Sequence, residues 1–265
     1  MGILKPLFNR RKYRPASSKL DQLYLLGSGS THDDMELRYS LRSLEKYCKN
    51  YGRIFVVGRK PDWLTNVEFL PCEDCYDAAH KNMMNKITYA CKETDISEDF
   101  VMQADDHFYV RPYDFSDIRL YDKGVIRKDI QEGHAGNPYH ASMSDTRFFL
   151  RHIGYPYMNS SQHCGMWYKR SLWLSMEDTI LREAFDYPYG LENSSLMANA
   201  MHQQLHIPFT YRKDCKIADF NGEQDLLNKI DGNFCFSIYD SAFQHAILPI
   251  LNRWFPTPSK YEQLY

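Results

Sequence analysis

The sequence predicts an α/β fold in which helices flank a mostly parallel central sheet. With 265 residues, of which 43% are hydrophobic and 15% aromatic, the chain can bury a full core. In its first half, short apolar runs alternate with segments of helical periodicity, which is typical of strand–helix–strand units. A net charge of −2 at pH 7 argues against a generally basic nucleic-acid-binding protein.

The predicted elements of the first half follow one another closely. Asp33 and Asp34 precede a helix in which Leu37, Leu41 and Leu44 recur at spacings of three and four residues. Right-handed crossovers between such elements bring the carboxyl ends of parallel strands to one edge of a sheet. In order, we expect a strand at 23–26, a Gly/Ser loop at 27–30, a helix up to 47, strands at 53–57 and 67–70, a helix at about 78–92 and a strand at 100–102.

The second half of the sequence predicts less regular structure. Residues 119–162 are rich in Tyr, His, Gly and Pro, which suits loops that cover a site. Helical stretches are expected near 171–185, 194–206 and 241–254. We therefore expect this half to be rich in loops and helices.

The N-terminal residues stand apart by their positive charge. Residues 1–19 contain Lys5, Arg10, Arg11, Lys12 and Arg14. Such an arm is either a solvated tail or a contact for a nucleic-acid backbone, an anionic membrane surface or an acidic partner. We expect one domain to follow it at residues 20–265, with halves at about 20–118 and 119–265.

Targeting signals and cysteine chemistry are sparse. No apolar stretch approaches the roughly 20 residues that span a bilayer, and the N-terminus lacks the hydrophobic segment of a secretory signal, so we expect a cytoplasmic protein. The seven scattered cysteines do not suggest a disulfide framework. Cys72 and Cys75 have zinc-knuckle spacing, but no matching second pair follows them.

Asp105 and Asp106 are the most informative residues, because they stand together where an apolar strand ends. Two adjacent carboxylates are costly to desolvate unless a cation or a hydrogen-bonded ligand neutralises them. Mg²⁺ or Mn²⁺ is typically held by one or two carboxylates, while nucleotide phosphates supply further oxygens. Ligands of parallel sheets bind beyond the carboxyl ends of the strands, where the loop at 27–30 also lies. The pattern indicates a nucleotide-sugar site, although two such acids also suit an ordinary loop.

Several separated segments carry a family resemblance. In chain order they are residues 34–47, 53–57 and 61–64, Asn85-Lys86-Ile87, the Asp105-Asp106 segment, His163 with Lys169-Arg170-Ser171, Phe234-Cys235-Phe236 and residues 255–262. Together they resemble the Stealth family, which includes bacterial capsular-polysaccharide phosphotransferases and the lysosomal-targeting GlcNAc-1-phosphotransferase. The resemblance implies a GT-A-type core, a nucleotide-diphosphate sugar such as a UDP-sugar as donor, a divalent metal (Mn²⁺ or Mg²⁺) and a hydroxyl acceptor.

The chain also departs from the family pattern. The Gly/Ser loop at 27–30 replaces the family's Thr-Trp-Val region, and the family's His-x-Pro is His163-Cys164-Gly165 here. The arginine expected after the next helix has no equivalent near residues 186–188. Without this arginine the site lacks a cation suited to a transferring phosphate, which favours transfer of the sugar over transfer of the sugar-1-phosphate.

The resemblance and the local pattern together give the two acids different roles. We predict that Asp106 binds the metal and that His107 adds a ligand, the alternative for His107 being a solvated loop side chain. On an extended chain Asp105 points to the side opposite Asp106. We predict that Asp105 has a catalytic role and contacts the hydroxyls of the donor. The metal would neutralise charge on the diphosphate as a bond to phosphorus or to the anomeric carbon breaks.

Two more residues are predicted to be catalytic. Glu36 lies in the first turn of the helix after the Gly/Ser loop. There it either complements the helix dipole or has a role in the site, where it accepts the proton of the acceptor or binds hydroxyls of the donor. His163 is either structural or a general base at the acceptor. Glu192 and Asp240 are weaker candidates for contacts with sugar hydroxyls. The remaining donor-binding residues that we predict are Gly27, Ser28, Gly29 and Arg38.

These inferences converge on a metal-dependent glycosyltransferase that delivers a sugar to a hydroxyl. The acceptor is either a surface glycan or a hydroxymethylated base of bacteriophage DNA, in which case the protein acts in the host cytoplasm. Residues 20–118 would then bind the nucleotide, and residues 119–265 would cover the acceptor. The alternatives are a Stealth-type sugar-1-phosphate transferase that forms a phosphodiester and a non-catalytic Stealth-like binding module.

Overall fold

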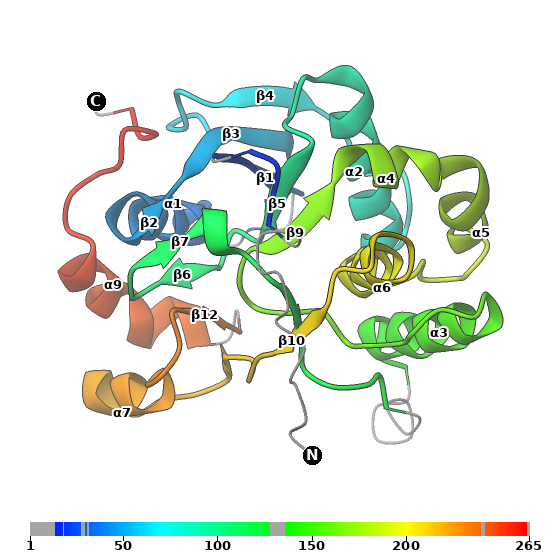
Figure 1. Ribbon diagram of the computed structural model, residues 1–265. Coiled ribbons are helices and arrows are strands. Elements are labelled where there is room, and N and C mark those ends of the chain that lie inside the picture. The colour runs from blue at the N-terminus through cyan, green and yellow to red at the C-terminus, as the bar shows by residue number, and fades with distance from the viewer. Residues whose placement is uncertain are drawn as a thin grey trace, which may run out of the picture.

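A five-stranded, mostly parallel sheet forms the centre of the protein (Figure 1). The computed structural model describes residues 14–17, 19–27, 30, 32–127, 136–239 and 242–263, so residues 1–13 of the predicted basic arm lie outside the described residues. The first four strands are parallel, and β9 pairs antiparallel with β5. In spatial order the strands are β4 (Glu68–Pro71), β3 (Tyr51–Gly58), β1 (Leu20–Leu26), β5 (Asp99–Gln103) and β9 (Met166–Lys169).

Helices cover both faces of this sheet because strands are added first on one side of β1 and later on its other side. The path from β1 through α1 (Met35–Tyr47) to β3 and β4 runs towards one side, and α2 (Ala79–Glu93) returns the chain to β5. Right-handed crossovers in opposite directions place their helices on opposite faces. The predicted α/β class and its mostly parallel sheet are therefore confirmed.

The α1 helix packs on the sheet through the periodicity seen in the sequence. Leu37, Leu41 and Leu44 are fully buried in the core cluster that also contains β1 and β3. A buried hydrogen bond of 3.2 Å joins the Tyr24 hydroxyl of β1 to the Ser40 hydroxyl of α1. This packing fixes the start of α1 close to the end of β1.

Small sheets extend the fold beside α1. The β12 strand (Cys235–Ile238) lies between β11 (Lys216–Ile217) and β6 (Phe108–Tyr109), and it is antiparallel to β6. This arrangement brings residues after position 230 next to the turn that follows β5. The other short strands pair as β8 (Leu120–Asp122) with β10 (Phe209–Tyr211) and β2 (Cys48–Lys49) with β7 (Tyr113–Asp114).

The helices within residues 138–205 lie at the β9 side of the sheet, whereas those within residues 222–254 lie on the opposite side, near α1 (Figure 1). The α6 helix contacts α2, α3 and β9, and α4 contacts α2. No helix in the described part of the chain is long and apolar enough to cross a membrane. The helical segments are α3 (Pro138–His152), α4 (Arg170–Ser175), α5 (Arg182–Ala184), α6 (Asn193–Leu205), α7 (Gly222–Lys229) and α9 (Leu248–Trp254), with the short segments η2 (Phe115–Asp117), η3 (Glu177–Leu181) and η4 (Phe243–Ile247).

The 15-residue helix α3 corrects the prediction of loops at residues 119–162. Asn137 caps the helix by accepting hydrogen bonds from the Tyr139 and His140 backbone N–H groups at 2.9 and 3.3 Å. Pro138 occupies the first turn, where proline is favoured because its missing N–H needs no partner. The average composition of this region concealed these local start signals.

Candidate functional site

Polar residues follow the parallel strands at the C-terminal edge of the sheet. Asp105 and Asp106 come directly after β5, Gly27 follows β1, and Arg59 follows β3. Because β1, β3 and β5 are parallel, these residues share one edge. Ser28 and Gly29, which we predicted to bind the donor, lie outside the described residues.

Four acids crowd together at this edge. Burial raises the pKa of Asp105 to about 7, and the negative charges of Asp106, Glu36 and Asp34 add to the increase. Burial also raises the pKa of Asp34, although the nearby charge of Arg59 opposes the shift. The structure therefore brings together the predicted residues Glu36, Asp105 and Asp106. Such a concentration of carboxylate oxygens favours a bound cation.

Asp106 is held in place by a residue far along the chain. The Ser237 hydroxyl of β12 donates a short hydrogen bond to Asp106 Oδ2. Ser237 is fully buried, so this contact fixes one oxygen of the Asp106 carboxylate. Sequence reasoning missed Ser237 as a site residue, and Asp240, three positions later, lies outside the described residues.

Glu36 lies in a strained segment at the start of α1. Its carboxylate is 3.4 Å from the Ser30 hydroxyl and 3.8 Å from His32 Nε2. The preceding residues Asp33 and Asp34 both have positive φ angles, of 55° and 52°. Non-glycine residues in this left-handed region cost about 1–3 kcal/mol each and are concentrated at functional sites. The strain therefore supports a functional role for this turn.

An open cleft of about 500 Å³ lies at the ends of β1, β3 and β4, and it is lined by Arg59, whose charge acts on Asp34. At its base, buried Lys86 donates a hydrogen bond to the Leu26 carbonyl at 2.9 Å and pairs with Asp74 at 2.6 Å. The volume lies within the range of small-molecule sites. The cleft is lined by Leu26, Gly27, Gly58, Arg59, Pro71, Cys72, Glu73, Asp74 and Lys86.

His107 directly follows Asp105 and Asp106, and its side chain contacts residues of the same turn. Its side chain is buried, with Nδ1 at 3.2 Å from the Ala104 backbone nitrogen and 3.1 Å from Gln103 Oε1. Burial lowers the pKa of His107 to about 4, despite the opposing charge of Asp106. The imidazole is therefore neutral at pH 7 and supports the turn. Metal binding by His107 stays a prediction.

His163 is paired with Asp214. Its Nδ1 lies 2.7 Å from Asp214 Oδ2, and its backbone N–H donates to Asp214 Oδ1 at 2.8 Å. The charges of His163 and Asp214 both act on buried His107. Nothing in the local sequence marks Asp214, because it is 51 residues away.

Arg38 is directed towards the C-terminal segment. Its guanidinium pairs with Glu262 at 3.3 Å and stacks over the Trp63 ring at 4.3 Å. Arg42 also pairs with Glu262, at 2.6 Å. Residues two positions apart on a helix lie on different faces, so Arg38 does not share the face of Glu36. Donor binding by Arg38 stays a prediction.

Three further residues have structural contacts. Glu192 caps α6 by accepting hydrogen bonds from the Ser194 and Ser195 backbone N–H groups at 3.2 and 2.7 Å. The Cys72 and Cys75 thiols both contact the Glu73 carbonyl, and all seven cysteines are free. Within the described ranges, no group of three or more His, Cys, Asp or Glu side chains is arranged to hold a metal ion. A metal at Asp106 would therefore need ligands from a substrate, as phosphate oxygens provide.

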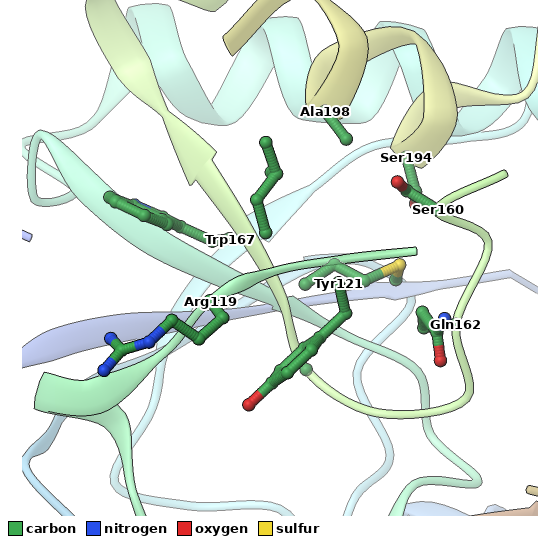
Figure 2. Close-up of a pocket in the computed structure, with 10 residues that line it drawn as sticks. Arg119, Tyr121, Ser160, Gln162, Trp167, Ser194 and Ala198 are labelled. Carbon is green, nitrogen blue, oxygen red and sulfur yellow. The ribbon is translucent and has the colours of Figure 1, made fainter. Parts of the chain in front are cut away.

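A second cavity, between β8, β9 and α6, is too small to be a substrate site (Figure 2). Its volume is about 10 Å³, which is the space of one water molecule. The Ser160 hydroxyl, which has no protein partner, lines it together with Ser194. Clefts of about 360, 620 and 390 Å³ lie elsewhere, but the described residues of the loops that directly follow β1, β3 and β5 do not line them, so the acids and the cleft beside Arg59 are the candidate site.

Comparison with known proteins adds no relative to this picture, because neither a family model nor a curated protein matches the chain.

Proposed function

We propose that the protein is a metal-dependent glycosyltransferase of the GT-A type, which transfers a sugar from a nucleotide-diphosphate sugar to a hydroxyl group. The observation that carries this proposal is that Asp105 and Asp106 lie at the C-terminal edge of the parallel sheet, where a cleft of about 500 Å³ also opens. Buried like charges are costly unless a cation neutralises them. The resemblance to the Stealth family supports the donor, the metal and the hydroxyl acceptor, while transfer of the sugar-1-phosphate, as in Stealth enzymes, is the alternative reaction.

In the proposed complex, the nucleoside occupies the cleft and its diphosphate lies over the acids. Asp106 and the diphosphate oxygens would hold Mn²⁺ or Mg²⁺, which supplies charge stabilisation when the leaving nucleotide departs. Asp105 and Glu36 bind sugar hydroxyls. His163 accepts the proton of the acceptor hydroxyl through its Nε2, because Asp214 occupies Nδ1.

Purified protein incubated with a panel of nucleotide sugars, with and without Mn²⁺, tests this proposal. Release of nucleoside diphosphate supports sugar transfer, and release of nucleoside monophosphate means that the sugar-1-phosphate is transferred instead. Separate reactions with hydroxymethylated DNA and with a glycan identify the acceptor. Absence of Mn²⁺-dependent release with every donor would overturn the proposal.

Thermal unfolding separates an enzyme from a binding module. A ligand that binds only the folded protein stabilises it, by about 2.7 kcal/mol at 100 times its Kd. We expect UDP to raise the Tm more in the presence of Mn²⁺ than in its absence. Stabilisation without turnover of any donor would indicate the non-catalytic module.

A further inference from the structure

The Asp214 carboxylate holds His163 at two points. One oxygen accepts the His163 backbone N–H at 2.8 Å, and the other lies 2.7 Å from the ring Nδ1. An ionised carboxylate only accepts hydrogen bonds, so Nδ1 carries a proton and donates it to Asp214. The basic lone pair of the neutral ring is then on Nε2. The His163 side chain is 23% exposed, so an incoming ligand can reach it.

The surroundings keep Asp214 ionised. Burial by itself would raise its pKa, but the hydrogen bond and charge of His163 and the charge of Lys123 lower the pKa well below its usual range. Lys123 Nζ lies 2.9 Å from Oδ2, and the Arg212 guanidinium lies 3.7 Å from Oδ1. The Cys215 backbone N–H also donates to Oδ1, at 3.0 Å.

The His163–Asp214 pair is connected to the turn that holds Asp105 and Asp106. Hydrogen bonds link the pair to Asp106 through Ser237, because the Ser237 backbone N–H donates to the Cys215 carbonyl at 3.0 Å and the Ser237 hydroxyl donates to Asp106 Oδ2. Cys215 is next to Asp214 in the chain, so His163 lies on the same side of the fold as the predicted metal ligand. The titratable groups that face the pair are Lys123, Arg212, His107, Tyr139, Cys164 and Cys215.

We propose that Asp214 is a positioning residue, which holds His163 in the Nδ1–H tautomer so that Nε2 removes the proton from the acceptor hydroxyl. This inference rests on the proposed function. The acceptor oxygen forms a bond to the anomeric carbon as its proton moves to Nε2, and the bond from that carbon to the phosphate oxygen breaks. The nucleoside diphosphate leaves with the electron pair, and Asp214 balances the charge of the imidazolium. A single displacement of this kind inverts the anomeric carbon.

The variant Asp214→Asn tests the role of the second oxygen. An asparagine has one acceptor oxygen, so it cannot accept from both the His163 backbone N–H and Nδ1–H. If its oxygen keeps the backbone N–H, its NH₂ group faces Nδ1 and shifts the ring proton to Nε2. We expect kcat to fall by about 10²–10⁴-fold, as when a histidine loses its orienting carboxylate, with the KM for the donor little changed.

Three controls separate positioning from folding. Asp214→Glu should recover part of kcat. In a His163→Ala background, Asp214→Asn should have little further effect, because both changes remove the same function. Asp231→Asn changes an exposed acid that pairs with Arg111, and this variant should leave kcat unchanged. Equal losses from Asp214→Asn in both backgrounds, or a product that retains the anomeric configuration, would overturn the proposal.

A measurement without substrate keeps the inference independent of the proposed function. The ¹⁵N shifts of the His163 ring report which nitrogen carries the proton. We expect the Nδ1–H tautomer in the wild type and the Nε2–H tautomer in Asp214→Asn. If this change occurs and no donor is turned over, Asp214 positions His163 but the proposed function fails. If the tautomer is the same in both proteins, the positioning role fails whatever the activity.

Discussion

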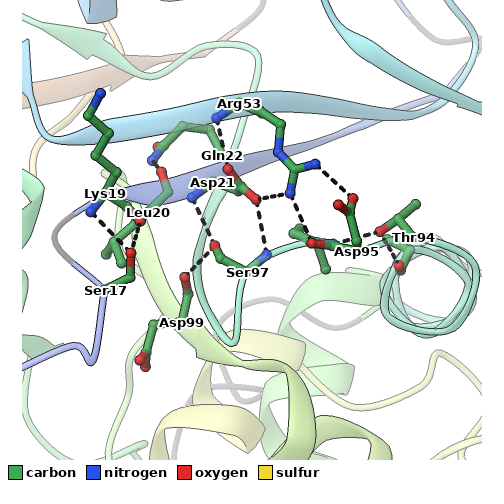
Figure 3. A network of polar contacts seen from close by, with 12 residues as sticks. Ser17, Lys19, Leu20, Asp21, Gln22, Arg53, Thr94, Asp95, Ser97 and Asp99 are labelled. Carbon is green, nitrogen blue, oxygen red and sulfur yellow. Dashed lines mark hydrogen bonds and ion pairs between the residues drawn. The ribbon is translucent and has the colours of Figure 1, made fainter.

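Acids at the N-terminal edge of the central sheet are matched by donors, whereas those at the C-terminal edge crowd against one another. Asp21, at the start of β1, accepts hydrogen bonds from the Arg53 and Ser97 backbone N–H groups at 2.8 and 3.0 Å and pairs with the Arg53 guanidinium at 2.8 Å (Figure 3). Asp99, at the start of β5, accepts from Lys169 at 2.7 Å. These contacts join β1, β3, β5 and β9.

The C-terminal edge differs in its balance of charge. The pKa of Asp105 is raised to about 7 by burial and by the neighbouring charges of Asp106 and Glu36. In the sequence, Asp21 and Asp105 look equivalent, because each is an acid at a boundary of a buried strand, Asp21 at the start of β1 and Asp105 after β5. The number of donors around each carboxylate distinguishes Asp21, which joins neighbouring strands, from Asp105, for which we propose a ligand.

The largest effect should come from Asp106→Asn. If the proposed function holds, the rate of sugar transfer should fall by about 10³-fold or more, because the proposed metal would lose its protein ligand. The Tm without ligand should change little. Nucleotide release measures the rate, and Asp231→Asn, an exposed acid outside the site, is the matched control. Full activity in Asp106→Asn would contradict the proposal that the acids at the C-terminal edge of the sheet are functional.

Asp21→Ala should affect stability rather than activity. It leaves the Arg53 and Ser97 backbone N–H groups without their acceptor, at a cost of about 1–3 kcal/mol for each group that stays buried and unpaired. Urea unfolding measures this loss, and the activity per folded molecule should stay the same. Asp95→Ala removes the exposed second partner of Arg53 and should cost much less. Equal losses in the two variants would mean that the Asp21 network is not a structural anchor.

Asp105→Asn should stabilise the protein at neutral pH. Because the folded-state pKa of about 7 exceeds the usual value of about 3.9, the folded protein binds more protons between these values. The contribution of Asp105 to stability is therefore lost as pH rises from about 4 to about 7. At pH 7.5 we expect the variant to have the higher Tm, by roughly 2–4 °C per kcal/mol of repulsion removed. The difference should shrink at pH 5 or when Mn²⁺ is added, and a difference independent of pH would contradict this account.

Arg59→Ala should have the smallest effect. Arg59 lines the cleft and its charge opposes the increase in the pKa of Asp34, so it offers a cation to an anionic ligand. We expect the Kd for UDP to rise about 3–10-fold, which is the usual size of a partly exposed charge contact, with an unchanged Tm in the absence of ligand. Titration calorimetry measures the change. Lys60→Ala, an exposed neighbouring cation, is the control.

The order of strands and helices in the first half could be predicted because its signals are local. The leucines of α1 recur with the period of a helix, and they are buried where that period places them. The second half was harder to predict. The α3 helix begins with Asn137 and Pro138 but lies in a region whose overall composition resembles loops. The antiparallel strand β9 depends on pairing with β5 rather than on a pattern of its own.

The candidate site divides in the same way. The position of Asp105 and Asp106 after an apolar strand is written in consecutive residues, and parallel strands bring such positions to one edge. Their partners come from far along the chain: Ser237 is 131 residues from Asp106, and Asp214 is 51 residues from His163. Contacts of this kind depend on how loops and small sheets fold back onto the core, which local periodicity does not encode. The residue types at the sheet edge are thus fixed by the chain itself, while their burial, charge balance and hydrogen-bond partners arise only when distant segments pack together.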